Sequence, residues 1–237
     1  MNTTPRIHAM IVAAGRGSRF GASIAKQYTL FQGQTLLQHS MERLACSAFI
    51  EQCWLVIAAD DTTAQMLNFA LPVQYATGGA ERWQSVQAGV EAIRQSGAAD
   101  TDLVLIHDAA RPAVPSCDID KVITAAMHEP YGAILATPVA DTLKHSYVQD
   151  AGLPTYIAQT LDRSNIWQAQ TPQVLRLDQL QKVLQHVSEQ QIAITDEASA
   201  FESLSLPIRL VAGSRQNIKL TYPDDAALLS AILSLQT

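Results

Sequence analysis

Short apolar runs and amphipathic stretches alternate along most of this chain. The runs have the length and composition of buried strands, whereas the stretches repeat apolar residues at the three- and four-residue spacing of a helix. The runs predict strands over residues 8–14, 54–59, 73–76, 103–107, 133–137 and 208–211. The stretches predict helices over residues 35–44, 83–97, 118–128, 177–190 and 197–204, with a further apolar helix after Pro223.

The alternation of strand and helix predicts the fold class. The expected strands are apolar almost without interruption, which is typical of parallel strands buried on both faces. We therefore expect an α/β, Rossmann-like fold with a mostly parallel sheet flanked by helices. Ligands of such sheets bind at the carboxyl ends of the strands. Glycine or acidic positions follow three of the strands, at 15–17, 78–79 and 108, so we expect these positions to converge.

Residues 139–159 break this pattern. They carry polar side chains such as Asp141, Lys144 and His145, and a polar turn at 149–152. The pattern predicts a β-hairpin that protrudes from the sheet and has too little apolar surface for a core of its own. We expect a single domain over residues 1–237, with 139–159 as a projecting arm that packs against the second subunit of a homodimer.

Composition and charge narrow the class of protein. Hydrophobic residues make up 48% and charged residues 16% of the chain, as in ordinary globular enzymes and unlike disordered chains. The net charge of −6 gives no broad positive field for nucleic acid. No apolar run approaches the roughly 20 residues that span a bilayer. Three cysteines without metal-site spacing suit a reducing compartment, so we expect a cytoplasmic protein without nucleic-acid or membrane partners.

The first expected strand ends in a glycine-containing turn that suits an anion. Gly15 and Gly17 leave backbone N–H groups unobstructed, and Arg19 and Lys26 follow as spaced cations. A P-loop and a dinucleotide fingerprint both require glycine where this chain has Phe20, so neither fits. Taken by itself, such a turn equally fits a tight strand–helix connection. The other motifs must therefore decide between a phosphate site and a plain turn.

Two further motifs follow expected strands. Gly79 lies between a strand and a helix that carries Ser85 in its first turn, a pattern that also fits an ordinary connection. Asp108 opens the sequence Asp-Ala-Ala-Arg-Pro, in which Arg111 either orders the turn or balances the carboxylate. The carboxylate can accept hydrogen bonds from ribose or polyol hydroxyls, help hold a metal ion, or pair with Arg111 for structure alone.

Together these motifs resemble one enzyme family over residues 11–223. The matching segments lie in the same order at 13–19, 26–28, 78–85, 108–112, 138–144, 162–163, 171–173, 195–199 and 217–221. They resemble the 2-C-methyl-D-erythritol 4-phosphate cytidylyltransferases of isoprenoid synthesis. The chain departs from the family pattern at Ala25, where proline is usual, and at Ala80, where aspartate is common.

The resemblance implies roles for particular residues. It implies CTP binding by Ala13, Ala14, Gly15, Gly17, Lys26, Gly79, Ser85, Asp108 and Ala109. It implies polyol-phosphate binding by Asp108, Arg111, Thr142, Arg163, Thr171, Thr195 and Lys219. It implies catalysis by Arg19, Lys26, Arg163 and Lys219. From the residues alone, Thr195 equally fits a helix cap, and Arg163 and Lys219 equally fit solvated surface cations.

The implied reaction joins two anions. The phosphate of 2-C-methyl-D-erythritol 4-phosphate attacks the α-phosphorus of CTP in line and expels pyrophosphate. That phosphate is already an anion at neutral pH, so no general base is needed, and catalysis rests on positioning and charge stabilisation. The resemblance implies that Arg19 and Lys26 stabilise the α-phosphate, while Lys219 and Arg163 of a partner subunit hold the attacking phosphate. Mg²⁺ is expected to bind mainly through the CTP phosphates, with no metal site made by the protein.

Other functions fit part of the pattern. A cytidylyltransferase for another polyol phosphate, such as ribitol 5-phosphate, shares the loop and Asp108, and a sugar-1-phosphate nucleotidyltransferase is a more distant possibility. A non-catalytic nucleotide-binding regulator would tolerate loss of Lys26 or Lys219, and this chain has both. An NAD-dependent oxidoreductase fits least, because the glycine spacing fails.

Overall fold

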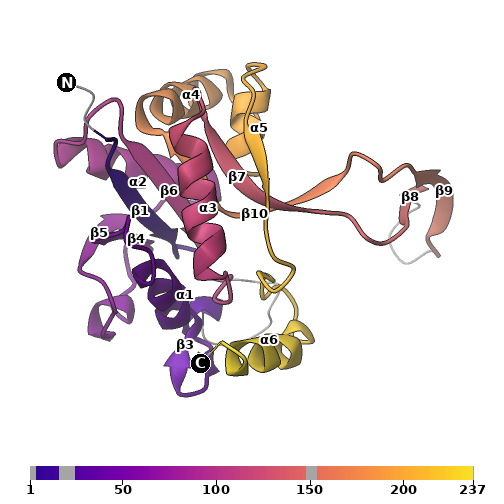
Figure 1. Cartoon of the computed structure of the whole chain (residues 1–237), viewed down its shortest axis with the longest axis horizontal. Helices are drawn as coiled ribbons and strands as arrows, with labels where there is room; N and C mark the ends of the chain where they lie inside the picture. The colour runs from indigo at the N-terminus through magenta and orange to yellow at the C-terminus, as the bar shows by residue number, and fades with distance from the viewer. Residues whose placement is uncertain (1–3, 16–24, 148–153, 237) are drawn as a thin grey trace.

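The computed structural model describes residues 4–15, 25–147 and 154–236, and its centre is a seven-stranded sheet (Figure 1). The strand order is β11-β7-β10-β6-β1-β4-β5. The strands are β1 (Ile7–Val12), β4 (Cys53–Ile57), β5 (Val73–Thr77), β6 (Leu103–Asp108), β7 (Gly132–Pro138), β10 (Trp167–Arg176) and β11 (Arg209–Ala212). All neighbouring pairs are parallel except those made by β10, which runs antiparallel to β6 and β7. The predicted mostly parallel α/β sheet is confirmed.

Strand β10 is the main element that the hydrophobic pattern does not predict. It inserts between β6 and β7 in the middle of the sheet. Its pairing with β7 shifts register between Ala169 and Gln173, and Pro172 lies within that shift. Proline cannot donate to a strand ladder, and it is tolerated inside a sheet at such irregularities. The six predicted strands are all present, with ends within two residues of their expected positions.

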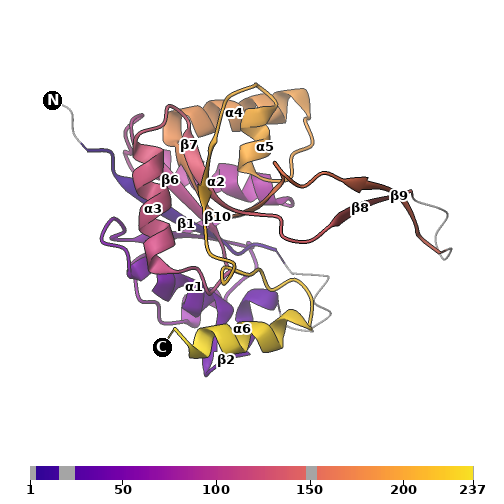
Figure 2. The ribbon, with the colours of Figure 1, turned by 45° about the vertical axis from the view of Figure 1, so that its right-hand side comes forward.

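Helices cover both faces of the sheet (Figure 2). One face packs against α1 (Leu36–Ala45) and α3 (Ser116–Met127). The other packs against α2 (Arg82–Gln95), α4 (Leu177–Gln190) and α5 (Glu197–Glu202). A smaller core joins α6 (Asp225–Ser234) to the short hairpin β2 (Leu30–Phe31) and β3 (Gln34–Thr35). The described residues also form two 3₁₀ turns, η2 (Lys26–Tyr28) and η3 (Ala64–Met66).

Local capping explains where two of these helices begin. Thr35 caps α1 with a capping box, because its hydroxyl accepts from the Gln38 N–H while the Gln38 side chain accepts from the Thr35 N–H. Helix α5 is capped by Asp196, whose carboxylate accepts from the Ser199 N–H. The interpretation of Thr195 as the cap of this helix is therefore wrong by one residue, which leaves the Thr195 side chain available to a site.

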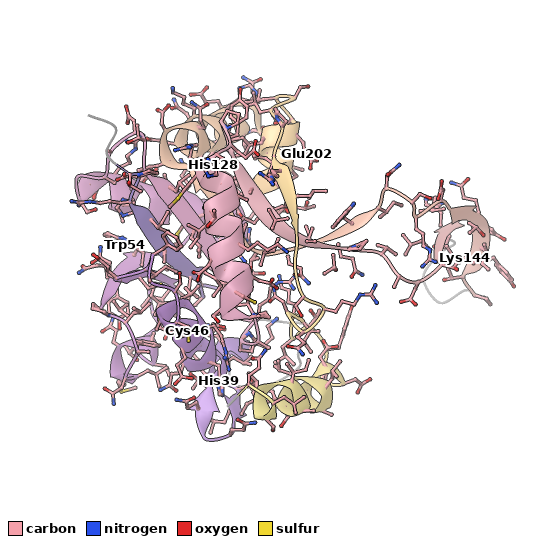
Figure 3. The ribbon with its side chains drawn as sticks, in the orientation of Figure 1. His39, Cys46, Trp54, His128, Lys144 and Glu202 are labelled. Carbon is pink, nitrogen blue, oxygen red and sulfur yellow. The ribbon has the colours of Figure 1, made fainter. Side chains whose placement is uncertain are left out.

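The predicted arm is a two-stranded sheet of its own. Strands β8 (Leu143–Tyr147) and β9 (Tyr156–Leu161) pair antiparallel and extend away from the body, with Lys144 far from the central sheet (Figures 1 and 3). The rings of Tyr147 and Tyr156 stack with centroids 6.0 Å apart, and Ile157 is exposed. In the parts of the chain that the structure describes, no helix is long and apolar enough to cross a membrane.

Candidate active site

A pocket of about 220 Å³ opens at the carboxyl ends of β1, β5 and β6, and we call it the first pocket. It is lined by Val12, Ala13, Ala14, Gly15, Lys26, Gln27, Gly79, Ala80, Glu81, Arg82, Ser85, Asp108, Ala109, Ala110 and Lys219. Every described residue of the predicted CTP set is in this lining. Gly17 and Arg19 lie outside the described residues. The convergence expected from strand ends is thus present for the described part of the set.

The turn after β5 forms one wall of the first pocket by close backbone packing. Its Gly78 N–H donates to the Ile57 carbonyl (2.8 Å), and the Gly79 N–H donates to the Ser85 hydroxyl (3.1 Å). A Cβ atom added to Gly78 would lie 2.5 Å from the Ala14 Cβ, closer than real contacts allow. Glycine at 78 therefore lets the turn after β5 touch the turn after β1.

The 3₁₀ turn η2 holds Lys26 against the rim of the first pocket. The Lys26 ammonium donates to the Leu220 carbonyl (2.7 Å), and the Gln27 amide donates to the Ala13 carbonyl (2.8 Å). The Tyr28 hydroxyl donates to the Asp61 carboxylate. Burial and this carboxylate raise the pKa of Tyr28, so the phenol stays protonated. Three consecutive side chains thus fix the position from which Lys26 faces the pocket.

Asp108 is the charged centre of the site. Its Oδ1 accepts from Nε and Nη2 of Arg82 (3.2 and 3.1 Å), and its Oδ2 accepts from Nζ of Lys219 (2.6 Å). Burial acts to raise the pKa of Asp108, but Arg82 and Lys219 outweigh it and hold the pKa well below the usual range. The carboxylate is therefore ionised at neutral pH and has both oxygens occupied by cations.

A chain of hydrogen bonds through Thr171 and His107 holds the backbone of Asp108 in place. The Asp108 N–H donates to the Thr171 hydroxyl (3.0 Å), which lies 3.1 Å from Nδ1 of His107. Nε2 of His107 lies 3.0 Å from the Arg111 carbonyl. Because a carbonyl only accepts, Nε2 carries the proton, and Nδ1 accepts from the Thr171 hydroxyl. Burial lowers the pKa of His107 to about 4, so this single neutral tautomer persists at pH 7.

Arg111 orders the loops around the site. Its Nη1 donates to the Asn217 carbonyl (2.7 Å) and its Nη2 to the Ala169 carbonyl (3.3 Å). The Leu220 N–H donates in turn to the Ala110 carbonyl (2.9 Å). These bonds tie residues 217–220 to the turn after β6. They thereby fix the backbone that carries Lys219.

A second pocket of about 100 Å³ shares part of its wall with the first. Its lining is Arg82, Asp108, Arg111, Ala169, Gln170, Thr171, Gln173, Thr195, Asp196 and Lys219. It therefore gathers Asp108, Arg111, Thr171, Thr195 and Lys219 of the predicted polyol-phosphate set. Lys219 also lines a larger pocket of about 570 Å³ at the base of the arm. Lys219 thus lines all three pockets.

Thr142 and Arg163 do not join the other predicted residues within one chain. Thr142 precedes β8 and Arg163 follows β9, so both lie at the feet of the arm, and both are exposed. Neither lines any of the three pockets. This placement leaves them free to meet another molecule.

Two site residues were missed by the sequence interpretation. Arg82, the first residue of α2, bridges Asp108 and Glu197 through opposite edges of its guanidinium. Glu197, the first residue of α5, has no exposed side-chain surface. Burial raises the pKa of Glu197, an effect that Arg82 opposes. The available signal was an acidic residue at the start of α5, which is equally typical of an ordinary helix N-terminus.

The described residues do not form a protein-held metal site. No group of three or more His, Cys, Asp and Glu side chains among them is placed to hold an ion. Asp108 has both carboxylate oxygens bonded to nitrogen cations.

Comparisons with known proteins match the whole described site. Residues 7–235 match the family described as 2-C-methyl-D-erythritol 4-phosphate cytidylyltransferase. A protein of that name from Psychrobacter arcticus is 67% identical over 100% of this chain and 94% of its own length, and one from Burkholderia multivorans is 43% identical over 98% and 97%. A crystal structure of 4-diphosphocytidyl-2C-methyl-D-erythritol synthase superposes with a TM-score of 0.83 at 35% identity, covering 98% of this chain and 100% of that one. The chain therefore belongs to the 2-C-methyl-D-erythritol 4-phosphate cytidylyltransferase family.

Proposed function

We propose that this site carries out the family's reaction, the CTP-dependent transfer of CMP to 2-C-methyl-D-erythritol 4-phosphate in isoprenoid synthesis. One observation supports this most directly. The pocket lined by the predicted CTP residues and the pocket lined by the predicted polyol-phosphate residues share Arg82, Asp108 and Lys219. Two substrates bound there would meet at one carboxylate and two cations.

The chemistry follows from the charges at this junction. The phosphate of the polyol is an anion at neutral pH, so the site needs no base to activate it. Lys26 faces the first pocket and stabilises the α-phosphate of CTP as its charge grows, an effect that Arg19 is proposed to share. Lys219 lies at the meeting point and holds the attacking phosphate in line. Asp108 accepts a hydrogen bond from the Lys219 ammonium and so directs it, and the remaining acceptor capacity of its two oxygens is open to the ribose or polyol hydroxyls.

We propose that Mg²⁺ enters as part of the CTP complex. The described residues supply no set of carboxylates for it, so its ligands are phosphate oxygens and water. Such an ion supplies charge neutralisation of the triphosphate.

We propose that two chains form a homodimer in which each arm completes the other chain's site. The exposed positions of Thr142 and Arg163 at the feet of the arm, outside the pockets of their own chain, support this arrangement. The exposed Tyr156 and Ile157 on β9 provide apolar surface for the contact. We place the enzyme in the cytoplasm, because Cys46, Cys53 and Cys117 are all free thiols.

Mixing two inactive variants tests the shared site. An Arg163→Ala chain has an intact body and a defective arm, whereas a Lys26→Ala chain has the reverse. Mixed dimers restore one complete site, so we expect roughly a quarter of native activity after exchange of subunits. No recovery after proven exchange would show that the arm serves its own chain.

Pyrophosphate release tests the substrate. We expect release from CTP only when 2-C-methyl-D-erythritol 4-phosphate is added. Release with ribitol 5-phosphate instead would favour a cytidylyltransferase for a different polyol, and binding of CTP without release by either polyol would favour a nucleotide-binding regulator.

A further inference from the structure

An ion pair between Arg82 and the buried Glu197 lies next to the Asp108–Lys219 pair. One of its two members, Glu197, lines neither substrate pocket. Glu197 begins α5 and has no exposed side-chain surface. Its Oε1 accepts from Nη1 of Arg82, the first residue of α2. Glu197 is absent from the linings of both the first and the second pocket, whereas Arg82 lines both. Glu197 therefore cannot contact a substrate directly and can act only through Arg82.

The ion pair continues into the site as a row of alternating charges. Glu197 bonds Arg82, Arg82 bonds Oδ1 of Asp108, and Oδ2 of Asp108 bonds Lys219. Two carboxylates balance two cations in this row. Because Arg82 occupies one oxygen of Asp108 from behind, the other oxygen is left for Lys219. The direction of the Lys219 ammonium thus depends on groups two contacts away.

We propose that Glu197 and Arg82 are positioning residues for the transfer reaction, which set the orientation of Asp108 and through it the placement of the Lys219 ammonium. This inference rests on the proposed roles of Asp108 and Lys219. Removing the Glu197 charge leaves Arg82 with Asp108 as its remaining carboxylate partner. Arg82 then donates to both oxygens of Asp108 and competes with Lys219 for Oδ2.

A purely structural role for Glu197 explains less. The N-terminus of α5 is already satisfied by other groups, since Asp196 caps the Ser199 N–H and the Gln173 side chain accepts from the Ala198 N–H (3.2 Å). Gln173 also donates to the Asp196 carboxylate (2.9 Å). The second oxygen of Glu197, Oε2, is buried without a hydrogen-bond partner among the described residues. A buried, half-satisfied carboxylate is a poor way to anchor a helix, so its value lies in the charge it presents to Arg82.

The test compares three variants with the wild-type enzyme. Glu197→Gln keeps the shape of the side chain and one acceptor oxygen but removes the negative charge. Arg82→Gln removes the guanidinium that pairs with Glu197. The double variant removes both charges together. Glu202→Gln, on the exposed side of the same helix, is the matched control (Figure 3). Steady-state kinetics with CTP and 2-C-methyl-D-erythritol 4-phosphate give kcat and both KM values, and thermal unfolding reports on the fold.

We expect Glu197→Gln to unfold near the wild-type temperature and to lose about 10- to 100-fold in kcat/KM for the polyol phosphate, as for a small misplacement of a reacting group. The double variant should be no slower than Arg82→Gln alone, because Glu197 acts through Arg82. Glu202→Gln should match the wild type.

Native kinetics in Glu197→Gln would overturn the proposal, and so would losses that multiply in the double variant. If the single Glu197 variant fails to fold, the charge-balanced double variant decides, since native kinetics there would equally overturn it. Turnover by the wild-type enzyme in the same assay tests the proposed function separately, so the two failures are distinguishable.

Discussion

The buried His107 makes a specific prediction about acid stability. Its pKa is about 4 in the folded protein and about 6.5 in an unfolded chain. Between these values the unfolded chain binds a proton that the folded protein does not, so the free energy of unfolding falls as the pH is lowered. The contribution is fully present above about pH 6.5, and by pH 4 the loss reaches about 3 kcal/mol.

Urea unfolding between pH 7 and pH 4 measures this loss when wild type is compared with His107→Gln. Glutamine cannot take up the proton, and its amide can still donate toward the Arg111 carbonyl. We expect the wild type to lose about 3 kcal/mol more than the variant over this range. The exposed His128→Gln serves as control and should follow the wild type. Equal losses in wild type and His107→Gln would refute the neutral, buried state of His107.

Three further changes test the first pocket and its support. Lys26→Ala should lower kcat on the order of 100-fold in a pyrophosphate-release assay, because a single electrostatic donor to the transition state is removed, whereas exposed Lys182→Ala should have no effect. Gly78→Ala should raise the KM for CTP about tenfold, a shift of about 1.4 kcal/mol in binding, because its Cβ would displace Ala14 from the pocket wall. Thr171→Val should lower the free energy of unfolding by about 2–4 kcal/mol in urea, because it removes the hydroxyl between His107 and the Asp108 N–H.

Each of these changes has its own contrary result. Near-native turnover by Lys26→Ala would remove that ammonium from the reaction. An unchanged KM for CTP in Gly78→Ala would mean that the contact between the two turns does not shape the pocket. Thr137 is a buried threonine for which the structure gives no side-chain hydrogen bond. If Thr171→Val lowers the free energy of unfolding no more than Thr137→Val does, the hydrogen-bond chain does not contribute to stability.

Local sequence patterns predict much of the fold. The largest element that they miss is β10, and the reason is physical. Leu103–Asp108 is buried at every position and reads as a strand without ambiguity. Strand β10 contains Gln168, Gln170, Pro172 and Gln173, which together read as a loop. Its buried polar side chains are satisfied only by distant parts of the chain, as when Gln173 bonds Asp196. A single-sequence pattern cannot see such partners.

The candidate site divides in the same way. Gly15, Gly79 and Asp108 follow strands, so topology alone predicts that they converge. Lys219 and Thr171 were identified by resemblance, because nothing in their local sequence distinguishes them from surface or core residues. Arg82 and Glu197 are separated by 115 positions in the chain, and their pairing exists only in the folded protein. Local periodicity predicts helices and strands, whereas ion pairs between residues of different elements can be identified only in the folded structure.

The central claim is that the phosphate of the polyol attacks the α-phosphorus of CTP at the Asp108–Lys219 junction. Mass spectrometry tests it with 2-C-methyl-D-erythritol 4-phosphate that carries oxygen-18 in its phosphate and with unlabelled CTP. Attack of the polyol phosphate on the α-phosphorus predicts that the cytidylylated product retains all of the label and that the released pyrophosphate contains none. Label in the pyrophosphate, or the absence of a cytidylylated product, would contradict it.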